Sequence, residues 1–237
     1  MVMSMLQRKK IKMTVPTLRV QKLGTLGFNK TLMIQKSASR KVLENLRAQN
    51  LEKNTGYLFL VEHDPVYTVG IRNKQYNEDE KKFKDIGADF VKTDRGGLIT
   101  FHGPGQLVAY PVIHLGFFSQ KKSIKWYVKQ LENSVIDVCY HFKLKANTSD
   151  NVGVWIKDSK VAAIGIHASR YVTTHGVALN CNVDLGWFSH IVPCGIPDKG
   201  VTSLSKELNR NVTVEETIPV FLNCFQKHFP CNFEYVS

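Results

Sequence analysis

The sequence of 237 residues lacks any apolar run that approaches the roughly 20 residues of a membrane-spanning helix. Its five cysteines are an odd number without a CxxC pair, which argues against a disulfide framework and against a structural zinc site. No Walker A loop and no helix-turn-helix, RNA-recognition or zinc-finger signature occurs. We therefore expect a soluble protein with reduced thiols that binds no metal, no membrane and no nucleic acid.

Acidic residues are missing from the first part of the chain. No Asp or Glu precedes Glu44, whereas Lys and Arg are frequent in the same stretch. Mitochondrial transit peptides share this composition. We expect a mitochondrial location, with residues 1–17 as a basic N-terminal leader segment and residues 18–237 as a single domain. An untargeted basic tail is the alternative.

The net charge of +12 favours an anionic partner. Nucleic acid and an acidic protein would respond to the same field, and charge that only maintains solubility is a third interpretation. Since nucleic-acid motifs are missing, the choice at this point lies between an acidic protein and general solubility.

Four helices are predicted, three from apolar spacing and one, over 77–90, from a charged segment. The last begins at a capping-box pattern formed by Thr213 and Glu216, although Pro219 weakens this prediction because it falls beyond the first turn. Cys139 lies on the apolar stripe of the clearest helix, so we expect it in the core. The other three helices are expected over 31–52, 77–90 and 121–142.

Short apolar runs predict strands, and two of them are separated only by Lys157-Asp158-Ser159, which is typical of a β-hairpin. Lys160 would then open a strand beside a turn. The mixture of strands and helices predicts an α/β (α+β) fold. The strands are expected over 56–61, 152–156, 160–166 and 176–182.

The densest block of glycine and proline runs from Arg95 to Pro111. Glycine lets a ligand approach the backbone closely, and Gly96 and Gly97 could offer N–H groups to an acyl or phosphate oxygen. His102 could orient a carbonyl, and Arg95 could bind an anion or anchor the loop. An ordinary glycine-rich turn is the alternative.

Lys160 and Cys194 form the candidate reactive pair. Cys194 lies between Pro193 and Gly195, an arrangement that can expose a thiol and leave backbone N–H groups for an oxyanion. A nearby lysine would favour the reactive thiolate. Cys181 lies in an apolar run and is expected to pack rather than react.

Taken together, the blocks closely resemble the lipoyl(octanoyl) transferase family over roughly Leu18 to Phe229. They occur in the family's order and are long enough that an accidental match is excluded. The matching blocks are Glu62–Gly70, Arg95–Pro111, Lys160–Gly165, His175–Asn182, and Pro193–Gly195 followed by Gly200–Leu204.

The resemblance implies a fold similar to the biotin/lipoate protein ligases, a mixed β-sheet flanked by helices. It implies transfer of an octanoyl group from octanoyl-acyl carrier protein to a lysine of lipoyl domains, as the first step of protein lipoylation. The acceptors would be lipoyl domains of 2-oxoacid dehydrogenase complexes and the glycine cleavage H protein. Neither ATP nor a metal would be a cofactor, and acidic partners would suit the net charge.

Carried onto matching positions, the resemblance implies that Cys194 is the acyl-thioester nucleophile. Lys160 would lower the pKa of that cysteine and assist proton transfer. Three segments would line the acyl pocket: Arg95, Gly96, Gly97, Leu98, Ile99, Thr100, Phe101 and His102; Ala163, Ile164 and Gly165; and Gly176, Val177 and Ala178.

Two alternatives stay open at this point. One is an ATP-dependent lipoate or biotin-type ligase on the same fold, against which the Cys194 motif argues. The other is a non-catalytic protein that binds lipoyl domains, against which the intact Lys160–Cys194 pair argues. One departure from the family is His167, where members often have arginine.

Overall fold

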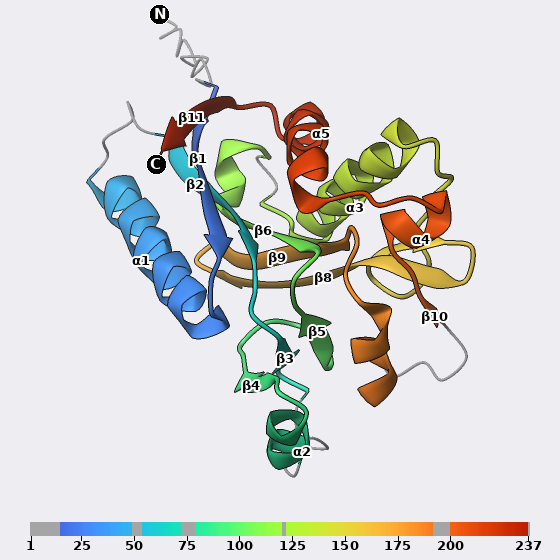
Figure 1. Cartoon of the computed structure of the whole chain (residues 1–237). Coiled ribbons are helices and arrows are strands. Elements are labelled where there is room, and N and C mark those ends of the chain that lie inside the picture. The colour runs from blue at the N-terminus through green and yellow to red at the C-terminus, as the bar shows by residue number, and fades with distance from the viewer. Residues whose placement is uncertain (1–14, 49–53, 73–78, 120–121, 192–199, 237) are drawn as a thin grey trace, which may run out of the picture.

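The computed structural model describes residues 15–48, 54–72, 79–119, 122–191 and 200–236. The larger of its two sheets consists of β1 (Thr17–Thr25), β2 (Thr55–Glu62), β6 (Gln106–Val112), β7 (Val154–Ile156), β8 (Ser159–Ser169), β9 (Val172–Asn180), β10 (Gly200–Val201) and β11 (Asn232–Val236). The strand order is β10-β8-β9-β6-β2-β1-β11, and β7 pairs with β8 (Figure 1). Parallel and antiparallel pairs both occur, so the predicted mixed α/β architecture is confirmed.

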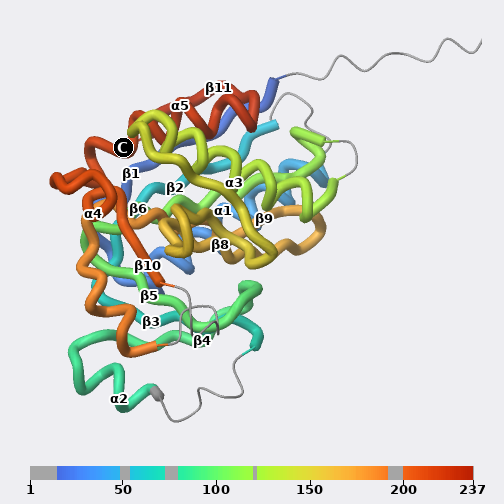
Figure 2. Tube along the Cα trace, turned by 90° about the vertical axis from the view of Figure 1, so that its right-hand side faces the viewer, coloured from blue at the N-terminus to red at the C-terminus, as the bar shows by residue number. Residues whose placement is uncertain are grey.

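Helices cover both faces of this sheet (Figures 1 and 2). On one face lies α1 (Phe28–Arg47), and on the other lie α3 (Ile124–His141) and α5 (Val214–His228). The short helix α4 (Leu204–Leu208) follows β10. Within the described residues, no helix is long and apolar enough to cross a membrane.

Strand β6 has buried apolar side chains on both faces of the large sheet, so helices must pack on both faces. Leu107 and Ala109 belong to the core shared with α3 and α5, whereas Val108 and Tyr110 belong to the core under α1. A strand that is buried on both faces reads as a continuous apolar run, and all of β6 is buried. The strand therefore fixes the position of both helical layers.

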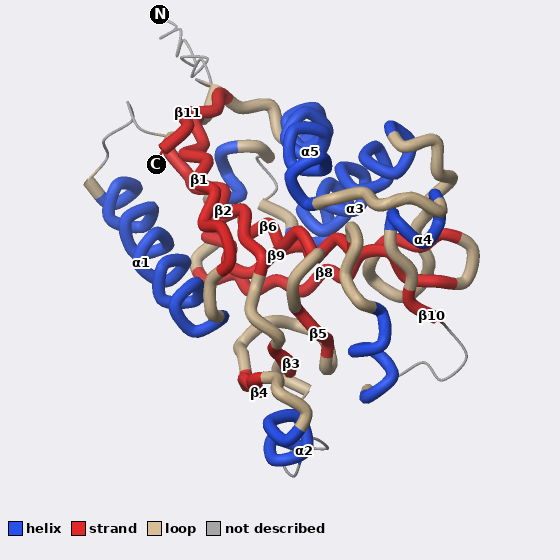
Figure 3. Tube along the Cα trace, viewed as in Figure 1, coloured by secondary structure: helices blue, strands red, loops and turns tan. Residues whose placement is uncertain are grey.

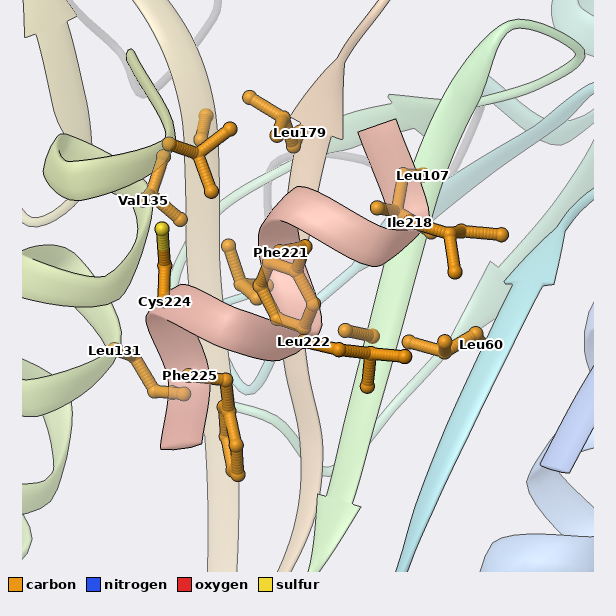
Figure 4. Packing of buried hydrophobic residues seen from close by; sticks show 14 of the residues in the cluster. Leu60, Leu107, Leu131, Val135, Leu179, Ile218, Phe221, Leu222, Cys224 and Phe225 are labelled. Carbon is orange, nitrogen blue, oxygen red and sulfur yellow. The ribbon is translucent and has the colours of Figure 1, made fainter. Parts of the chain in front are cut away.

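Helix α5 packs against both α3 and the sheet. Figure 4 shows its Leu222 close to Leu60 of β2 and its Cys224 close to Val135 of α3. The helix continues through Pro219, which costs one backbone hydrogen bond. Its buried apolar face stabilises it against that loss, and the predicted cap is present because the Thr213 side chain accepts from the N–H of Glu216.

A smaller sheet lies below the large one in the view of Figure 3. It consists of β3 (Val66–Val69), β4 (Asp89–Lys92) and β5 (Thr100–His102) in the order β4-β3-β5, and α2 (Asp79–Asp85) packs on it. The connection from β4 to β5 contains the start of the predicted glycine block, and its Gly96 contacts β8 of the large sheet.

Most predicted elements are confirmed with shifted ends. The first helix begins at Phe28 instead of 31 because the Phe28 side chain is buried against the sheet. Strand β9 begins at Val172 instead of 176 because its first residues pair with the end of β8. The predicted helix ends at 52, 77 and 121 fall outside the described residues.

Candidate active site

A pocket of about 340 Å³ lies between the large sheet and the β4–β5 connection. This volume is at the lower end of the range for small-molecule sites. Thirteen of the predicted lining and catalytic residues line it: Arg95, Gly97, Leu98, Ile99, Thr100, His102, Lys160, Ala163, Ile164, Gly165, Gly176, Val177 and Ala178. The structure therefore brings three segments that are distant in sequence to one cavity.

Small residues on β8 and β9 make room for this cavity. Ala163 pairs with Ala178, and Gly165 pairs with Gly176, so these four positions lie on one face of the sheet. A Cβ on Gly165 would lie 2.9 Å from Cδ of Arg95. Gly165 therefore lets the Arg95 side chain lie directly on the sheet.

An irregularity at the start of β8 turns Lys160 into the pocket. Lys160 and Ala163 line the cavity, whereas the two residues between them, Val161 and Ala162, are buried in the core with α3 and α5. Two consecutive side chains on one face break strict alternation, as a β-bulge does next to many active sites. Val161 is for this reason a core residue.

The Lys160 Nζ lies between a backbone carbonyl oxygen and an aromatic ring. It donates to the carbonyl oxygen of Val152 at 2.9 Å and lies 4.7 Å from the ring centroid of Trp155. Carbonyl dipoles and aromatic faces both attract a cation. The side chain is 6% exposed, so these contacts hold it in place at the pocket wall.

Gly153 and Glu132 support this arrangement from behind. Gly153 has φ +129°, a conformation that side chains rarely adopt, and its N–H donates to Oε1 of Glu132 at 3.2 Å. Glu132 is buried on α3. Glu132 thereby attaches to α3 the loop whose Val152 carbonyl accepts from Lys160.

Arg95 anchors the glycine block instead of projecting freely into the cavity. Its Nη2 donates to the carbonyl oxygen of Thr68 at 2.7 Å and to the Thr68 hydroxyl at 2.9 Å. Its Nη1 donates to the Gly96 carbonyl oxygen at 3.0 Å. The Gly96 N–H donates to the carbonyl oxygen of Ile166 on β8. The predicted donor role of Gly96 toward a ligand is therefore not available in this arrangement.

A one-way chain of hydrogen bonds continues from Thr68 across the pocket wall. Gln106 donates through Nε2 to Oδ1 of Asn180 at 2.9 Å, so its Oε1 accepts from Nδ1–H of His102 at 2.7 Å. The other ring nitrogen of His102 then accepts from the Thr68 hydroxyl at 3.3 Å. Asn180 finally donates to the carbonyl oxygen of Thr202 at 2.9 Å.

The buried rings of His63 and Tyr110 are also joined by a hydrogen bond. Nδ1 of His63 donates to the Leu26 carbonyl oxygen at 2.7 Å, and its Nε2 accepts from the Tyr110 hydroxyl at 2.8 Å. Burial lowers the pKa of His63 to about 4, and burial also lowers the pKa of His102 well below its usual value. Both imidazoles are neutral near pH 7, so His102 presents an uncharged ring to the cavity, and His63 lies uncharged behind it.

His175 lies at the other end of the β8–β9 floor and adopts a positive φ of 59°. Its Nε2 contacts Oδ1 of Asp94 at 2.8 Å, and its backbone N–H donates to Oε1 of Gln35 at 2.7 Å. Burial lowers the pKa of His175, against the opposing effect of Asp94. The contacts hold an unfavourable backbone conformation and tie the glycine block and α1 to β9.

Not every predicted residue reaches the cavity. Phe101 is fully buried in the core of the small sheet, where its ring stacks on Trp187 with centroids 5.0 Å apart. Gly96 does not line the pocket either. Cys194 lies outside the described residues. On either side of its segment, Phe188 and Val201 line a small cavity of about 20 Å³ together with Lys160.

Eight further residues line the pocket that were not predicted from the sequence. Val108 and Tyr110 lie inside the recognised glycine block, and His175 directly precedes Gly176, so alternation along the strands could have found them. Phe28 gave no local signal because α1 is remote in sequence from the motifs. The full set is Phe28, Arg72, Val108, Tyr110, Asp150, Asn151, Val152 and His175.

The cysteines within the described part of the chain are core residues. Burial raises the pKa of the Cys139, Cys181 and Cys231 thiols to about 12, and it also raises that of Cys224. A thiol with a raised pKa is a poor nucleophile. The same part of the chain contains no group of three or more His, Cys, Asp or Glu side chains placed to hold a metal ion.

Comparison with known proteins agrees with this geometry. Residues 38–226 match the lipoyl protein ligase A/B catalytic domain. The chain is 51% identical to a mitochondrial octanoyl-acyl-carrier-protein:protein N-octanoyltransferase of Danio rerio, over 90% of this chain and 92% of the relative. It is 39% identical to the human enzyme of that name, over 92% of this chain and 96% of the relative.

Solved structures show the same fold at low identity. A lipoate-protein ligase A bound with ATP superposes with a TM-score of 0.71 at 14% identity, over 94% of this chain and 90% of that one. A putative lipoate protein ligase from T. acidophilum superposes with a TM-score of 0.70 at 14% identity, over 92% of this chain and 88% of that one. By its fold, its domain match and its relatives, the chain belongs to the lipoyl protein ligase A/B family and, within it, to the octanoyltransferases.

Proposed function

We propose that this octanoyltransferase works through a cysteine thioester, with Cys194 as the acyl carrier and Lys160 as its charge partner and proton acceptor. The overall reaction is that of its family: N-octanoyl transfer from octanoyl-acyl carrier protein to protein, the first step of lipoylation. Like the relatives from Danio rerio, Drosophila melanogaster and Xenopus tropicalis, it is mitochondrial. The observation that supports the mechanism best is the buried Lys160 ammonium at the wall of the pocket.

In the first step, the Cys194 thiolate attacks the carbonyl carbon of the octanoyl thioester. The bond to the sulfur of the carrier breaks, and the carrier leaves as a thiolate that takes the proton given up by the Lys160 ammonium. One thioester replaces another, so the step is nearly balanced. The Lys160 ammonium stabilises the attacking thiolate, since an opposite charge nearby favours the ionised form.

In the second step, the neutral amine of an acceptor lysine attacks the octanoyl-Cys194 carbonyl. A C–N bond forms, the C–S bond breaks, and the amine loses a proton. Acylation has removed the thiolate that favoured the charged form of Lys160, so the neutral amine of Lys160 becomes accessible as the proton acceptor. The new amide is more stable than the thioester, which drives transfer forward.

The pocket suits an unbranched acyl chain. At its buried wall, His102 directs both ring nitrogens at Gln106 and Thr68, so ring faces and small aliphatic groups remain there for the ligand. Each buried methylene contributes about 0.8 kcal/mol. An eight-carbon chain would therefore gain several kcal/mol of binding.

For the acceptors, we propose lipoyl domains of 2-oxoacid dehydrogenase complexes and the glycine cleavage H protein. Carrier and acceptor domains of this kind are acidic, and the exposed side of α1 offers a complementary surface. Helix α1 has one acidic residue, Glu44. Its basic residues are Lys30, Lys36, Arg40, Lys41 and Arg47. Electrostatic steering would speed both encounters, so we expect transfer to slow as salt rises.

The mechanism is tested by incubating the protein with octanoyl-acyl carrier protein and measuring its intact mass. We expect one octanoyl adduct on the wild type, mapped to Cys194, that disappears when a lipoyl domain is added. Cys194→Ser should form no thioester, and a Cys181→Ser control should still form it. An adduct on another residue, or transfer by Cys194→Ser at the wild-type rate, would overturn the proposal.

A further inference from the structure

The pocket has an inner end and an open mouth. Phe28, Tyr110 and Val108 are only 3%, 3% and 1% exposed, and we assign them to the inner end because Lys160 contacts Val152 at the exposed side. At the mouth, Val152 is 50% exposed, and Asp150 and its neighbour are exposed as well. An acyl chain that enters from the mouth therefore ends against the buried group.

From this geometry we infer that Phe28 is the residue that limits the length of the acyl chain. The inference rests on the proposed function, because it assumes that the cavity holds the acyl group. The Phe28 ring contacts three imidazoles, those of His63, His102 and His175, with centroid distances of 5.3, 6.0 and 6.5 Å. It is thus surrounded by rings that are themselves fixed by hydrogen bonds.

Phe28 differs from its neighbours at the inner end. Tyr110, His102 and His175 each make hydrogen bonds that a shorter side chain would leave unsatisfied. Phe28 contributes only apolar volume. Shortening this side chain lengthens the cavity without leaving a buried polar group unpaired. A substitution at Phe28 can therefore change the accepted length of the acyl chain without breaking a hydrogen bond.

The position of the ring is set by α1 rather than by the pocket. Phe28 is the first residue of the helix, and the buried residues Thr31, Gln35, Ala38 and Val42 hold α1 on the sheet. Oε1 of Gln35 also accepts from the backbone N–H of His175 at 2.7 Å, which joins α1 to the pocket strand β9. The depth of the cavity is therefore built into the packing of α1.

The test compares Phe28→Leu and Phe28→Ala with the wild type. Octanoyl-, decanoyl- and dodecanoyl-acyl carrier proteins compete for transfer to a lipoyl domain, and product masses give the ratios. We expect octanoyl to dominate in the wild type, and the dodecanoyl-to-octanoyl ratio to rise about tenfold or more in the Ala variant. Phe117→Leu is the matched control, since Phe117 lies in the same core outside the pocket.

Unchanged ratios in a Phe28 variant that still transfers octanoyl would overturn the inference and leave the proposed function intact. Failure of the wild type to form any octanoyl product would instead overturn the proposed function. Should Phe28→Ala not fold, Phe28→Leu and Ala178→Val decide. Ala178→Val adds volume beside Val108, with which Ala178 pairs on the neighbouring strand, and with hexanoyl-acyl carrier protein added to the competition we expect it to favour hexanoyl over octanoyl transfer.

Discussion

Gly153 and Lys160 are matched in shape: a Cβ on Gly153 would lie 3.2 Å from both Cε and Nζ of Lys160. The backbone of Gly153 also has φ +129° and would bring that Cβ within 2.7 Å of the Ala162 carbonyl oxygen. The absence of a side chain at one residue thus allows the ammonium of the other to reach the Val152 carbonyl. This relationship depends on backbone geometry that no neighbouring residue can replace.

We expect Gly153→Ala to lower octanoyl transfer by tenfold or more, because it displaces the Lys160 ammonium by a few tenths of an ångström or more. Initial rates of octanoyl transfer to a lipoyl domain give the measurement. Gly87→Ala is the control: Gly87 also has positive φ, +84°, but nothing lies within 4 Å of its Cβ position. It should cost about 1 kcal/mol of stability and leave the rate unchanged. Equal loss of activity in both variants would refute the role of the contact.

Replacing Lys160 with methionine should raise the pKa of the Cys194 thiol toward about 8.5, the value of a free cysteine. The measurement is the alkylation rate of Cys194 against pH, followed by peptide mass. The described cysteines do not interfere, since burial raises the pKa of their thiols. Lys157→Met, in the exposed turn of the same hairpin, should leave the profile unchanged. Identical profiles for Lys160→Met and the wild type would remove the electrostatic argument.

Stability should fall on acidification through the buried His63. Its pKa is about 4 in the folded protein and about 6.5 when unfolded, so between these values the unfolded state binds more protons. The contribution of neutral His63 to the free energy of unfolding is complete above pH 6.5 and is lost as the pH falls to 4. The free energy of unfolding changes by up to about 3 kcal/mol over this interval. Urea unfolding at several pH values measures it.

The matched variant for this prediction is His63→Gln, whose amide can still donate to Leu26 and accept from Tyr110. We expect a smaller loss of stability for this variant over the same pH interval, although its stability at pH 7.5 is lower. The same pH slope in both proteins would show that other groups, such as His102, cause the loss.

Thr68→Val should disturb the wall of the pocket, because the Thr68 hydroxyl links Arg95 to His102. Valine has a similar shape but leaves both partners short of one hydrogen bond, which costs about 1–3 kcal/mol. We expect a higher KM for the octanoyl donor, measured by steady-state kinetics. Thr93→Val removes the hydrogen bond that the Thr93 hydroxyl donates to the Val69 carbonyl oxygen. This bond lies outside the hydrogen-bonded series from Arg95 to Thr202, so the variant should change KM less. Equal KM values in both variants would contradict the prediction.

The sequence could predict those features that depend on nearby residues. The hairpin around Lys157 follows from apolar runs that flank three polar residues, and the final helix follows from the Thr213 cap. The bulge that turns Lys160 into the pocket could not be predicted, because Val161 and Ala162 look like any buried strand. Phe28 was missed for a different reason: it reaches the site only through the tertiary packing of α1 on the sheet.

The one-way order of donors from Arg95 to the Thr202 carbonyl has a consequence for how the site meets its substrate. If the Gln106 amide turned over, two acceptors would face each other toward Asn180 and two donors toward His102. No member can therefore rotate alone, and the wall takes its shape when the protein folds. Under the proposed function the acyl chain would bind in a pocket that is already shaped, so little binding free energy would be lost in ordering the protein.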